Sequence, residues 1–280
     1  MNLNLGIIGW PLQKTYSPII HEFLGEFLGI DVKYDKIPLE NLNKHIIQNI
    51  NTKLDGYNVT VPYKSKLVNL IGNLDNFISE QNVKDLSICN TIKLKDNNIY
   101  AYNTDVYGIS NTLDSIYEKI INKKFLILGS GGSAKTIEYL FQKQNQVTLV
   151  SRQANSNSIS YDQLNDIAPE IDILINATPI GMPPFENDEL SIPYDRFNNL
   201  EVFFNLGYNV NKNFLSKFSD EVIKVDGLKM LITQAVASFN IWTDSEINIE
   251  DVYHNITERL KNENSVSYTH LRAHETDSHL

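Results

Sequence analysis

An apolar run that leads directly into a glycine-rich turn limits what this chain can fold into more than any other feature. Residues 124–128 form a mostly apolar run of strand length, and residues 129–134 follow as GSGGSA. Gly129, Gly131 and Ala134 fit a pattern in which glycines allow a tight turn and backbone N–H groups face a pyrophosphate at a helix N-terminus. Because apolar residues at helical spacing follow the turn, the context predicts a dinucleotide site rather than a plain glycine-rich turn.

The strand that follows this loop indicates which dinucleotide is preferred. A site for NAD usually has Asp or Glu about 20 residues after the glycines, where it hydrogen-bonds the ribose 2′-hydroxyl group. Here the strand at 146–150 ends in Ser151-Arg152-Gln153, without an acidic residue. An arginine can pair with a 2′-phosphate and stack on adenine. Arg152 therefore favours NADP(H); the alternative is an ordinary surface arginine.

Strands and helices alternate along the chain in the manner of βαβ units, which implies mostly parallel sheets covered by helices. The predicted strands lie near residues 3–8, 32–37, 57–61, 88–94, 99–102, 124–128, 146–150, 171–175, 202–205 and 222–225. The predicted helices lie near 17–28, 42–50, 104–117, 137–141, 228–242 and 250–260. Ser17 is the expected N-cap of the first helix, and Pro18 fits its first turn.

This order predicts an α/β protein of two α/β domains, and a chain of 280 residues is long enough for two cores. Residues 1–104 are the expected substrate-binding and catalytic domain, with a mostly parallel sheet. Residues 105–238 are the expected Rossmann-like NADP-binding domain. The closing helices, at about 239–263, are expected to return to the first domain.

Composition and charge exclude several classes of partner. The formal net charge of −10 argues against nucleic acid or an anionic membrane as the main partner. We find neither an apolar run of membrane-spanning length nor a basic leader followed by an apolar segment, so we expect no membrane span and no signal peptide. Cys89 is the single cysteine, which rules out an internal disulfide and a cysteine metal cluster. We expect a cytoplasmic protein without a bound metal.

The last residues differ in character from the rest of the chain. Residues 265–280 contain His270, His274 and His279, half of the six histidines, without apolar periodicity. Metal binding by this stretch is one interpretation. We favour a non-native or disordered tail outside the fold.

Three polar segments follow predicted strands, at the strand ends where α/β domains bind their ligands. Thr15-Tyr16-Ser17 combines two hydroxyl groups with a helix start, which suits a carboxylate, unless Ser17 serves only as a cap. Residues 58–64 turn Asn58 and Thr60 to one side of a strand, and Lys64 follows just past its end. Asn103-Thr104-Asp105 follows a later strand. Out of this context, Lys64 would be a solvated charge and Asp105 a helix cap.

These segments resemble the motifs of the shikimate dehydrogenase family in order and approximate spacing, from about Leu5 to Leu260. The matching segments are Gly9-x-Pro11, Ser17-Pro18, Asn58-Val59-Thr60-Val61-Pro62-x-Lys64, Asn90-Thr91, Asn103-Thr104-Asp105, Gly129-x-Gly131-Gly132, Asn176-Ala177-Thr178-Pro179-x-Gly181-Met182, Gly227-x-x-Met230-Leu231-x-x-Gln234-Ala235 and Phe239-x-x-Trp242-Thr243. The resemblance implies NADPH-dependent interconversion of 3-dehydroshikimate and shikimate, a step of chorismate and aromatic amino acid biosynthesis.

The resemblance also implies roles for individual residues. Lys64 matches the family's catalytic lysine, and Asp105 its partner aspartate. The residues that match substrate contacts are Thr15 and Ser17 at the carboxylate and Asn58, Thr60, Asn90, Tyr208 and Gln234 elsewhere around the ligand. The residues that match NADP contacts are Gly129, Ser130, Gly131, Gly132, Ser133, Ser151, Arg152, Leu206 and Gly227. No metal is required, because the cofactor carries the redox step.

Other interpretations remain open at this point. Thr15 stands where the family usually has serine, which keeps a quinate/shikimate dehydrogenase using NAD(P) as an alternative. A non-catalytic sensor of a shikimate-pathway ligand is another, although the acidic charge argues against a nucleic-acid partner. A dehydrogenase acting on methylene-tetrahydrofolate would share the architecture without needing Ser17, Lys64 and Asp105 together. The expected partner is a small-molecule substrate, shikimate or 3-dehydroshikimate, bound by a monomer or homodimer.

Overall fold

The chain forms two compact units in the computed structural model, which describes residues 2–12, 15–182, 185, 187–208 and 215–277. The first unit comprises Met1–Ile78, Thr91–Ala101 and Ala235–Leu280, and the second Ser79–Asn90 and Tyr102–Gln234. Each unit combines a sheet with helices, and the predicted α/β fold class is confirmed. The assignment of residues 1–104 with 239–263 to substrate, and of 105–238 to NADP, stays a prediction.

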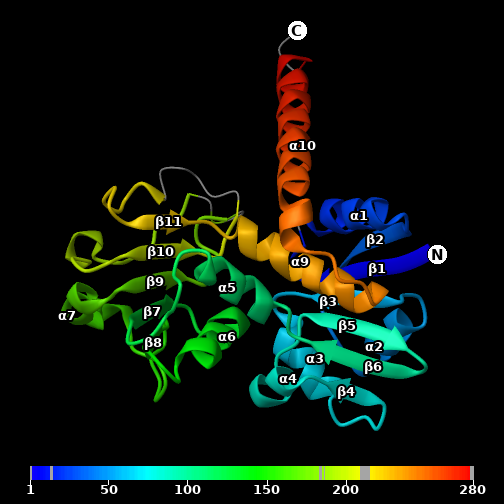
Figure 1. Ribbon diagram of the computed structural model, residues 1–280, viewed down its shortest axis with the longest axis horizontal. Coiled ribbons are helices and arrows are strands. Elements are labelled where there is room, and N and C mark those ends of the chain that lie inside the picture. Colours follow the sequence, from blue (N-terminus) through cyan, green and yellow to red (C-terminus); the bar gives the residue numbers. More distant parts are fainter. Residues whose placement is uncertain (1, 13–14, 183–184, 186, 209–214, 278–280) are drawn as a thin grey trace. The chain divides into compact units, whose positions relative to one another are not determined.

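The sheet of the first unit has six strands in the order β2-β1-β3-β5-β6-β4 (Figure 1). Its strands are β1 (Asn2–Gly9), β2 (Asp31–Pro38), β3 (Gly56–Val59), β4 (Phe77–Ser79), β5 (Thr91–Lys95) and β6 (Asn98–Tyr102). β1 pairs in parallel with β2 and β3, whereas β3 pairs antiparallel with β5. Asp96 and Asn97, which join β5 to β6, both have positive φ, as a two-residue hairpin turn requires.

The helices of the first unit are α1 (Ser17–Leu28), α2 (Lys44–Asn51), α3 (Tyr63–Ile71), the last part of α9 (Leu228–Thr243) and α10 (Ile249–Asp277). The prediction that Ser17 caps α1 is wrong. Tyr16 is the N-cap residue, and its side chain makes no capping bond. Instead the Thr15 hydroxyl accepts the Ser17 backbone N–H at 3.2 Å, just before the helix begins.

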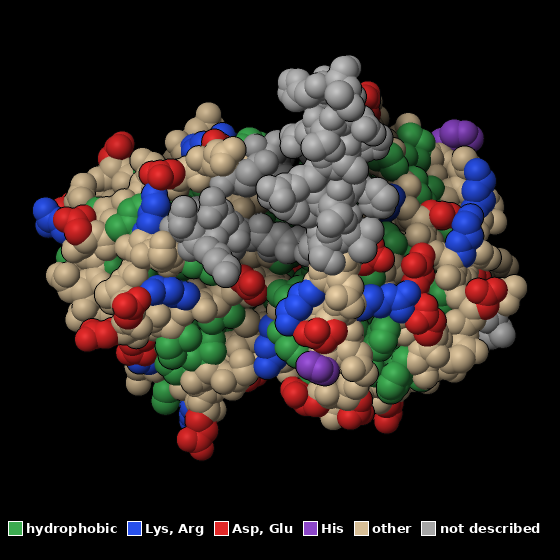
Figure 2. Space-filling view, turned by 90° about the horizontal axis from the view of Figure 1, so that it is seen from above, with side chains coloured by type: hydrophobic (Ala, Val, Ile, Leu, Met, Phe, Trp, Pro, Cys, Tyr) green, Lys and Arg blue, Asp and Glu red, His purple; other side chains and the backbone are tan. Residues whose placement is uncertain are grey.

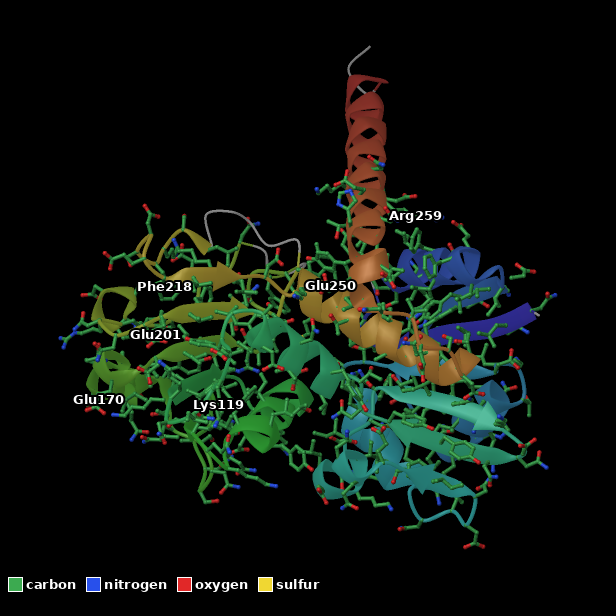
Figure 3. All side chains as sticks on the ribbon, in the orientation of Figure 1. Lys119, Glu170, Glu201, Phe218, Glu250 and Arg259 are labelled. Carbon is green, nitrogen blue, oxygen red and sulfur yellow. The ribbon has the colours of Figure 1, made fainter. Side chains whose placement is uncertain are left out.

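Helix α10 packs on α1 through a charged pair. Arg259, labelled in Figure 3, donates to both carboxylate oxygens of Glu26 at 2.6 and 2.9 Å. Its guanidinium group also lies over the Phe23 ring at 5.9 Å. The helix continues to Asp277, and thus through most of the stretch that we expected to be disordered. Whether that stretch is native stays a prediction.

One face of the first sheet is closed by aromatic side chains from α1 and α9. The His21 ring stacks on Tyr34 at 4.6 Å and meets Trp242 at 5.1 Å. Trp242 reaches across to β5 and donates its indole N–H to the Ile92 carbonyl at 2.8 Å. Gly56 makes room for this, because a Cβ atom there would lie 2.3 Å from the Trp242 indole nitrogen.

The sheet of the second unit has five strands in the order β11-β10-β9-β7-β8, and each adjacent pair is parallel. The strands are β7 (Lys124–Leu128), β8 (Gln146–Val150), β9 (Ile173–Asn176), β10 (Val202–Asn205) and β11 (Ile223–Val225). The helices are α4 (Gln81–Leu86), α5 (Asp105–Asp114), α6 (Gly132–Phe141), α7 (Leu164–Ile167), the first part of α9, and the 3₁₀ turns Tyr161–Gln163, Ala168–Glu170 and Tyr194–Arg196.

Two apolar clusters bury this sheet on both faces, as a parallel sheet requires. Phe125 and Ile127 of β7 belong to a cluster with residues of α5 and α6, and Leu126 and Leu128 belong to a cluster with residues of α7. A parallel bridge between Val150 and Ile159 adds one more position beyond β8. With this position counted as a further strand, the strand order is that of a Rossmann fold, and β7 lies at the point where the strand order reverses.

The described part of the chain contains no helix that is long and apolar enough to span a membrane. On the face seen in Figure 2, lysine and arginine side chains lie among aspartates and glutamates.

His21 gives the fold a specific dependence on pH. It is fully buried, and burial lowers its pKa to about 3, although the Asn58 side chain opposes the shift. The unfolded chain takes up a proton at His21 below about pH 6.5, which the folded chain does not bind until about pH 3, so stability falls as the pH drops through this window. We expect His21→Phe to reduce the acid-induced loss of stability by up to ~1.4 kcal/mol per pH unit, measured by urea unfolding between about pH 6.5 and 4. Equal pH slopes for both proteins would contradict a neutral, buried His21.

Candidate active site

The glycine loop lies at the carboxyl end of β7, as predicted. Gly129 donates its N–H to the Val150 carbonyl at 2.8 Å and has φ of +112°, a conformation that favours glycine. Gly131 is the N-cap residue of α6, and a Cβ atom on it would meet no other atom within 4 Å. The protein's own packing therefore does not require a glycine at this position. The glycine leaves the backbone open at the N-terminus of α6, where a pyrophosphate would have room to approach.

Ser130 and Gly131 are exposed, whereas Gly132 and Ser133 are half-buried in the first turn of α6. Among the described residues, none caps this helix with a side chain. Its first N–H groups are therefore open to an anion, without competition from a side-chain cap. The five predicted loop residues, 129–133, follow the carboxyl end of β7, and none of them is fully buried.

The segment after β8 presents Arg152 to solvent. Ser151 is buried, and its hydroxyl group bonds to Ser158 at 3.0 Å and to the Gln153 carbonyl. Ser151 therefore shapes the turn that carries Arg152. Burial raises the pKa of Tyr161, and the charge of Arg152 opposes that shift, so the two side chains are neighbours.

Leu206 and Gly227, both predicted NADP contacts, meet after β10 and before α9. A Cβ atom on Gly227 would lie 1.9 Å from the Leu206 carbonyl oxygen, so only glycine allows this approach. Gly227 also donates its N–H to the Gly207 carbonyl at 3.0 Å. Tyr208, the residue after Gly207, is half-buried.

Asn90, Asp105 and Gln234 come together in the second unit around the start of α5. The Asn90 amide donates to the Asp105 carboxylate at 2.8 Å, and its carbonyl accepts the Thr104 backbone N–H at 2.7 Å. Gln234 lies within 3.5 Å of Asn90 and 3.4 Å of the Thr104 hydroxyl. Asp105 is 4% exposed and occupies the first turn of α5, where the helix dipole stabilises a carboxylate. Cys89, which precedes Asn90, is fully buried.

A second polar contact ties this segment to the glycine loop. The Asn103 amide donates to the Thr136 hydroxyl at 3.2 Å, and Thr136 donates to the Gly132 carbonyl at 3.0 Å. Glu80 lies close by, where burial raises the pKa of its carboxyl group against the effect of hydrogen bonds from Asn82 and the Asn103 backbone. The residues before Asp105 and the first turn of α6 are thus held by the same side chains.

The remaining predicted substrate residues belong to the first unit. The Thr15 hydroxyl donates to the Ser17 hydroxyl at 3.0 Å at the start of α1. Asn58 lies in β3, and Thr60 follows that strand and accepts the Tyr63 N–H through its carbonyl at 2.8 Å. Lys64 is half-buried in the first turn of α3. The structure thus brings Thr15 to Ser17, and Asn58, Thr60 and Lys64 to one strand end and the following turn.

Sequence analysis missed several side chains that surround these residues. Helix α3 was not predicted, although Tyr63, Leu67 and Ile71, which it buries, recur every four residues. Tyr34, which hydrogen-bonds Asn58 at 2.7 Å, was also missed. Its sequence signal was weak, because Tyr34 is the one buried residue in a strand of otherwise exposed and half-buried positions.

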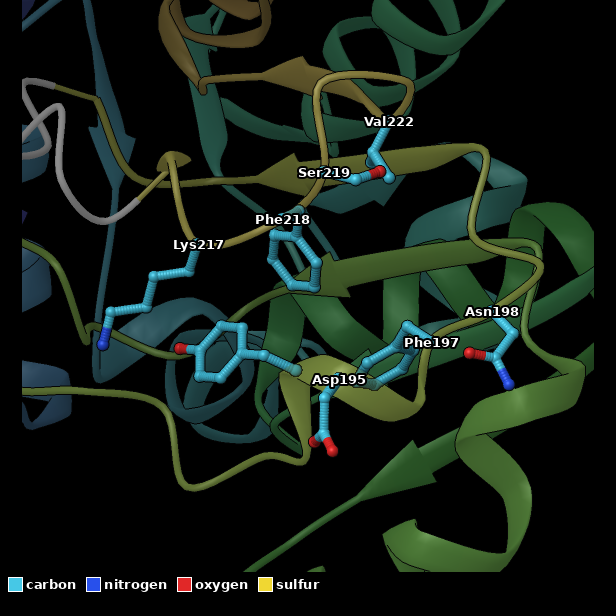
Figure 4. A pocket seen from close by; sticks show the side chains of 8 residues that line it. Asp195, Phe197, Asn198, Lys217, Phe218, Ser219 and Val222 are labelled. Atoms are coloured by element: carbon cyan, nitrogen blue, oxygen red, sulfur yellow. The ribbon is translucent and has the colours of Figure 1, made fainter.

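A hollow of about 460 Å³ lies elsewhere on the second unit, before β10 and β11 (Figure 4). Phe197 and Phe218 form part of its lining, and Lys217 pairs with Glu189 at 2.6 Å. It is at the amino end of these strands, whereas the glycine loop follows the carboxyl end of β7. None of the predicted site residues lines it.

The sheet order, the glycine loop at the strand-order reversal and the uncovered N-terminus of α6 together define a dinucleotide-binding α/β protein. The family model for the shikimate dehydrogenase substrate-binding domain matches residues 7–92. The shikimate dehydrogenase (NADP+) of Methanococcus maripaludis is 32% identical in an alignment 270 residues long that covers 89% of this chain and 93% of the relative. This chain therefore belongs to the shikimate dehydrogenase family.

Solved structures agree with this assignment. A chorismate mutase/shikimate 5-dehydrogenase fusion protein from Clostridium acetobutylicum has a TM-score of 0.82 at 29% identity, over 94% of this chain and 98% of that one. A shikimate dehydrogenase in complex with NADP+ has a TM-score of 0.77 at 27% identity, over 92% of this chain and 96% of that one.

Proposed function

We propose that this protein catalyses the reversible, NADPH-dependent reduction of 3-dehydroshikimate to shikimate. The observation that carries the proposal is the similarity to shikimate dehydrogenases named for NADP+, which extends over nearly the whole chain. Lys64 and Asp105, the two residues that the family's chemistry needs most, are both present. The reaction supplies shikimate to chorismate and aromatic amino acid biosynthesis.

The reaction needs a hydride at the substrate carbonyl carbon and a proton at its oxygen. Bound NADPH supplies the hydride from C4 of its nicotinamide. We assign the proton to Lys64, whose ammonium group stabilises the negative charge that develops on the C3 oxygen and then protonates it. We assign to Asp105 the role of the family's partner aspartate. Asn90 keeps the Asp105 carboxylate in a single orientation through its 2.8 Å hydrogen bond.

The substrate carboxylate fits the start of α1, where Thr15 and Ser17 offer hydroxyl groups beside a helix N-terminus. Thr60, Tyr208 and Gln234 are the proposed contacts for the rest of the ligand, together with Asn90. These side chains can recognise a shikimate hydroxyl group because hydroxyl and amide groups can both donate and accept hydrogen bonds, as the substrate hydroxyl does.

The cofactor proposal rests on the residues around the glycine loop. Residues 129–133 would hold the pyrophosphate, and Arg152 the 2′-phosphate, with Ser151 supporting the turn between them. Leu206 and Gly227 would lie against the nicotinamide half. A cytoplasmic location, with one buried cysteine in a reducing compartment, and a monomeric or homodimeric state complete the proposal.

The proposal is tested by following the absorbance of reduced nicotinamide in both directions. We expect turnover of 3-dehydroshikimate with NADPH, with NADH much less effective, and in reverse oxidation of shikimate in preference to quinate. Activity mainly with quinate and NAD would point to the change at Thr15 and to a quinate dehydrogenase. Ligand binding without turnover in any of these pairs would favour a sensor.

Replacing Lys64 tests the acid–base assignment. We expect Lys64→Ala to lower kcat by ~10²–10⁴, because the charge on the C3 oxygen is no longer neutralised, with little change in NADPH affinity. Steady-state kinetics and NADPH titration measure the two effects. Lys66→Ala is the matched control, since Lys66 is exposed on the same helix, over the Tyr63 ring at 5.6 Å. Unchanged turnover in Lys64→Ala would remove Lys64 from this role.

Replacing Arg152 tests how the cofactor is selected. We expect Arg152→Ala to weaken NADPH binding roughly 10- to 100-fold and NADH binding hardly at all, because only NADPH carries the 2′-phosphate. Fluorescence titration with both cofactors gives the ratio. Arg196→Ala, another exposed arginine of the second unit, is the control. Equal losses for both cofactors would show that the 2′-phosphate is recognised elsewhere.

A further inference from the structure

The first unit contains a buried polar network that the proposed reaction does not use. Asn58 is 5% exposed, and its side-chain carbonyl accepts the Tyr34 hydroxyl at 2.7 Å. Its amide nitrogen donates to the Thr91 and Ser238 hydroxyls, each at 3.1 Å, and these two hydroxyls bond to each other at 2.8 Å. Both N–H bonds of Asn58 are therefore already directed to protein oxygens.

This engagement changes the role expected of Asn58. An amide has two N–H donors, and here Thr91 and Ser238 take both of them. Donating to a substrate hydroxyl would mean giving up a buried hydrogen bond. Such a loss is unfavourable when the abandoned group stays buried. Asn58 is thus better suited to hold β3 in place than to bind the ligand directly.

Tyr34 is the residue that sets the orientation of this amide. It lies in β2, and β1 separates it from Asn58 in β3. Burial raises the pKa of Tyr34 well above its ordinary value, and the nearby Ser17 hydroxyl opposes that shift, so the phenol keeps its proton and remains a donor. The Tyr34 ring is held flat against His21, at an interplanar angle of 11°. Because the Tyr34 ring is fixed and its hydroxyl always donates, the side-chain carbonyl of Asn58 is held in one orientation, toward Tyr34.

The network lies next to two segments of the proposed substrate site. Asn58 lies two residues before Thr60, whose carbonyl receives the first hydrogen bond of the turn that leads to Lys64. Ser17, at the proposed carboxylate site, neighbours the Tyr34 hydroxyl and lies four residues before His21, on the same buried face of α1. One phenol group therefore lies between two segments that are proposed to bind the substrate.

We propose that Tyr34 is a positioning residue, which orients Asn58 and Ser17 and so fixes β3 and the start of α1 for the substrate. The inference rests on the proposed function, because it requires a substrate at these segments. Tyr34 itself does not contact the reacting atoms. Its removal should therefore affect the substrate and not the nucleotide, whose proposed contacts lie in the second unit.

The chain offers a matched pair of variants for the test. Tyr34→Phe removes one buried hydroxyl that donates to an asparagine side chain and leaves the ring stacked on His21. Tyr57→Phe makes the same change in β3, where the Tyr57 hydroxyl donates to Asn51 at 3.1 Å. Both tyrosines are buried, so similar losses of stability are expected. The Tyr57 hydroxyl bonds Asn51 in α2, whereas the Tyr34 hydroxyl bonds Asn58, two residues before Thr60.

We expect Tyr34→Phe to raise KM for 3-dehydroshikimate about tenfold, the equivalent of one lost positioning hydrogen bond, with KM for NADPH unchanged within about twofold. Tyr57→Phe should leave both values within about twofold of the wild type. Ser238→Ala, which removes one partner of the Asn58 amide, should raise KM for the substrate in the same direction, and it decides the question if Tyr34→Phe does not fold.

The outcomes are distinguishable. Absence of wild-type turnover with 3-dehydroshikimate and NADPH would reject the proposed function and the inference with it. Wild-type turnover with an unchanged substrate KM in Tyr34→Phe would reject the inference alone. An equal rise in KM in Tyr57→Phe would also reject it, because the effect would then reflect general loss of stability and not positioning.

Discussion

The second unit depends on one constraint: β7 is buried on both faces. Its side chains alternate between two apolar clusters, so helices must cover both sides of the sheet, and neighbouring strands must run in parallel through crossover connections. Such connections bring the loops after β7, β8 and β10 to the same edge of the sheet. Gly129, Arg152 and Leu206 are far apart in sequence, and this burial gathers them at one edge.

Buried asparagine side chains make many of the hydrogen bonds that hold the strand ends in place. Asn90 links the Asp105 carboxylate to the Thr104 backbone, and Asn58 joins β3 to β5 and α9. Asn176, at the end of β9, donates to Asn205 at 2.6 Å, and its carbonyl accepts two bonds from Thr178. An amide offers donors and acceptors on one rigid plane, so it can fix several groups without introducing a charge that burial would disfavour.

The sequence predicted what periodicity and turn chemistry determine. The β7 run and the glycine turn each have a local physical cause that is visible in the residues themselves. The cap of α1 was misassigned because Ser17 is already the first helical residue: Tyr16 occupies the N-cap position, and it is the Thr15 hydroxyl that accepts a backbone N–H, that of Ser17. Tyr34 could not be found, since its importance comes from a partner on a strand that is not its neighbour in the sheet. The role of a residue that acts on segments distant in sequence can be recognised only in the folded chain.

Cys89 has a practical consequence for work on this protein. It is the single cysteine and is fully buried, so thiol reagents have poor access to it while the chain is folded. An engineered surface cysteine would therefore be the one readily accessible attachment point. A fluorophore or spin label could be placed at a chosen position in either unit without first removing a native thiol. A pair of such labels, one on each unit, would turn the separation of the units in solution into a spectroscopic signal.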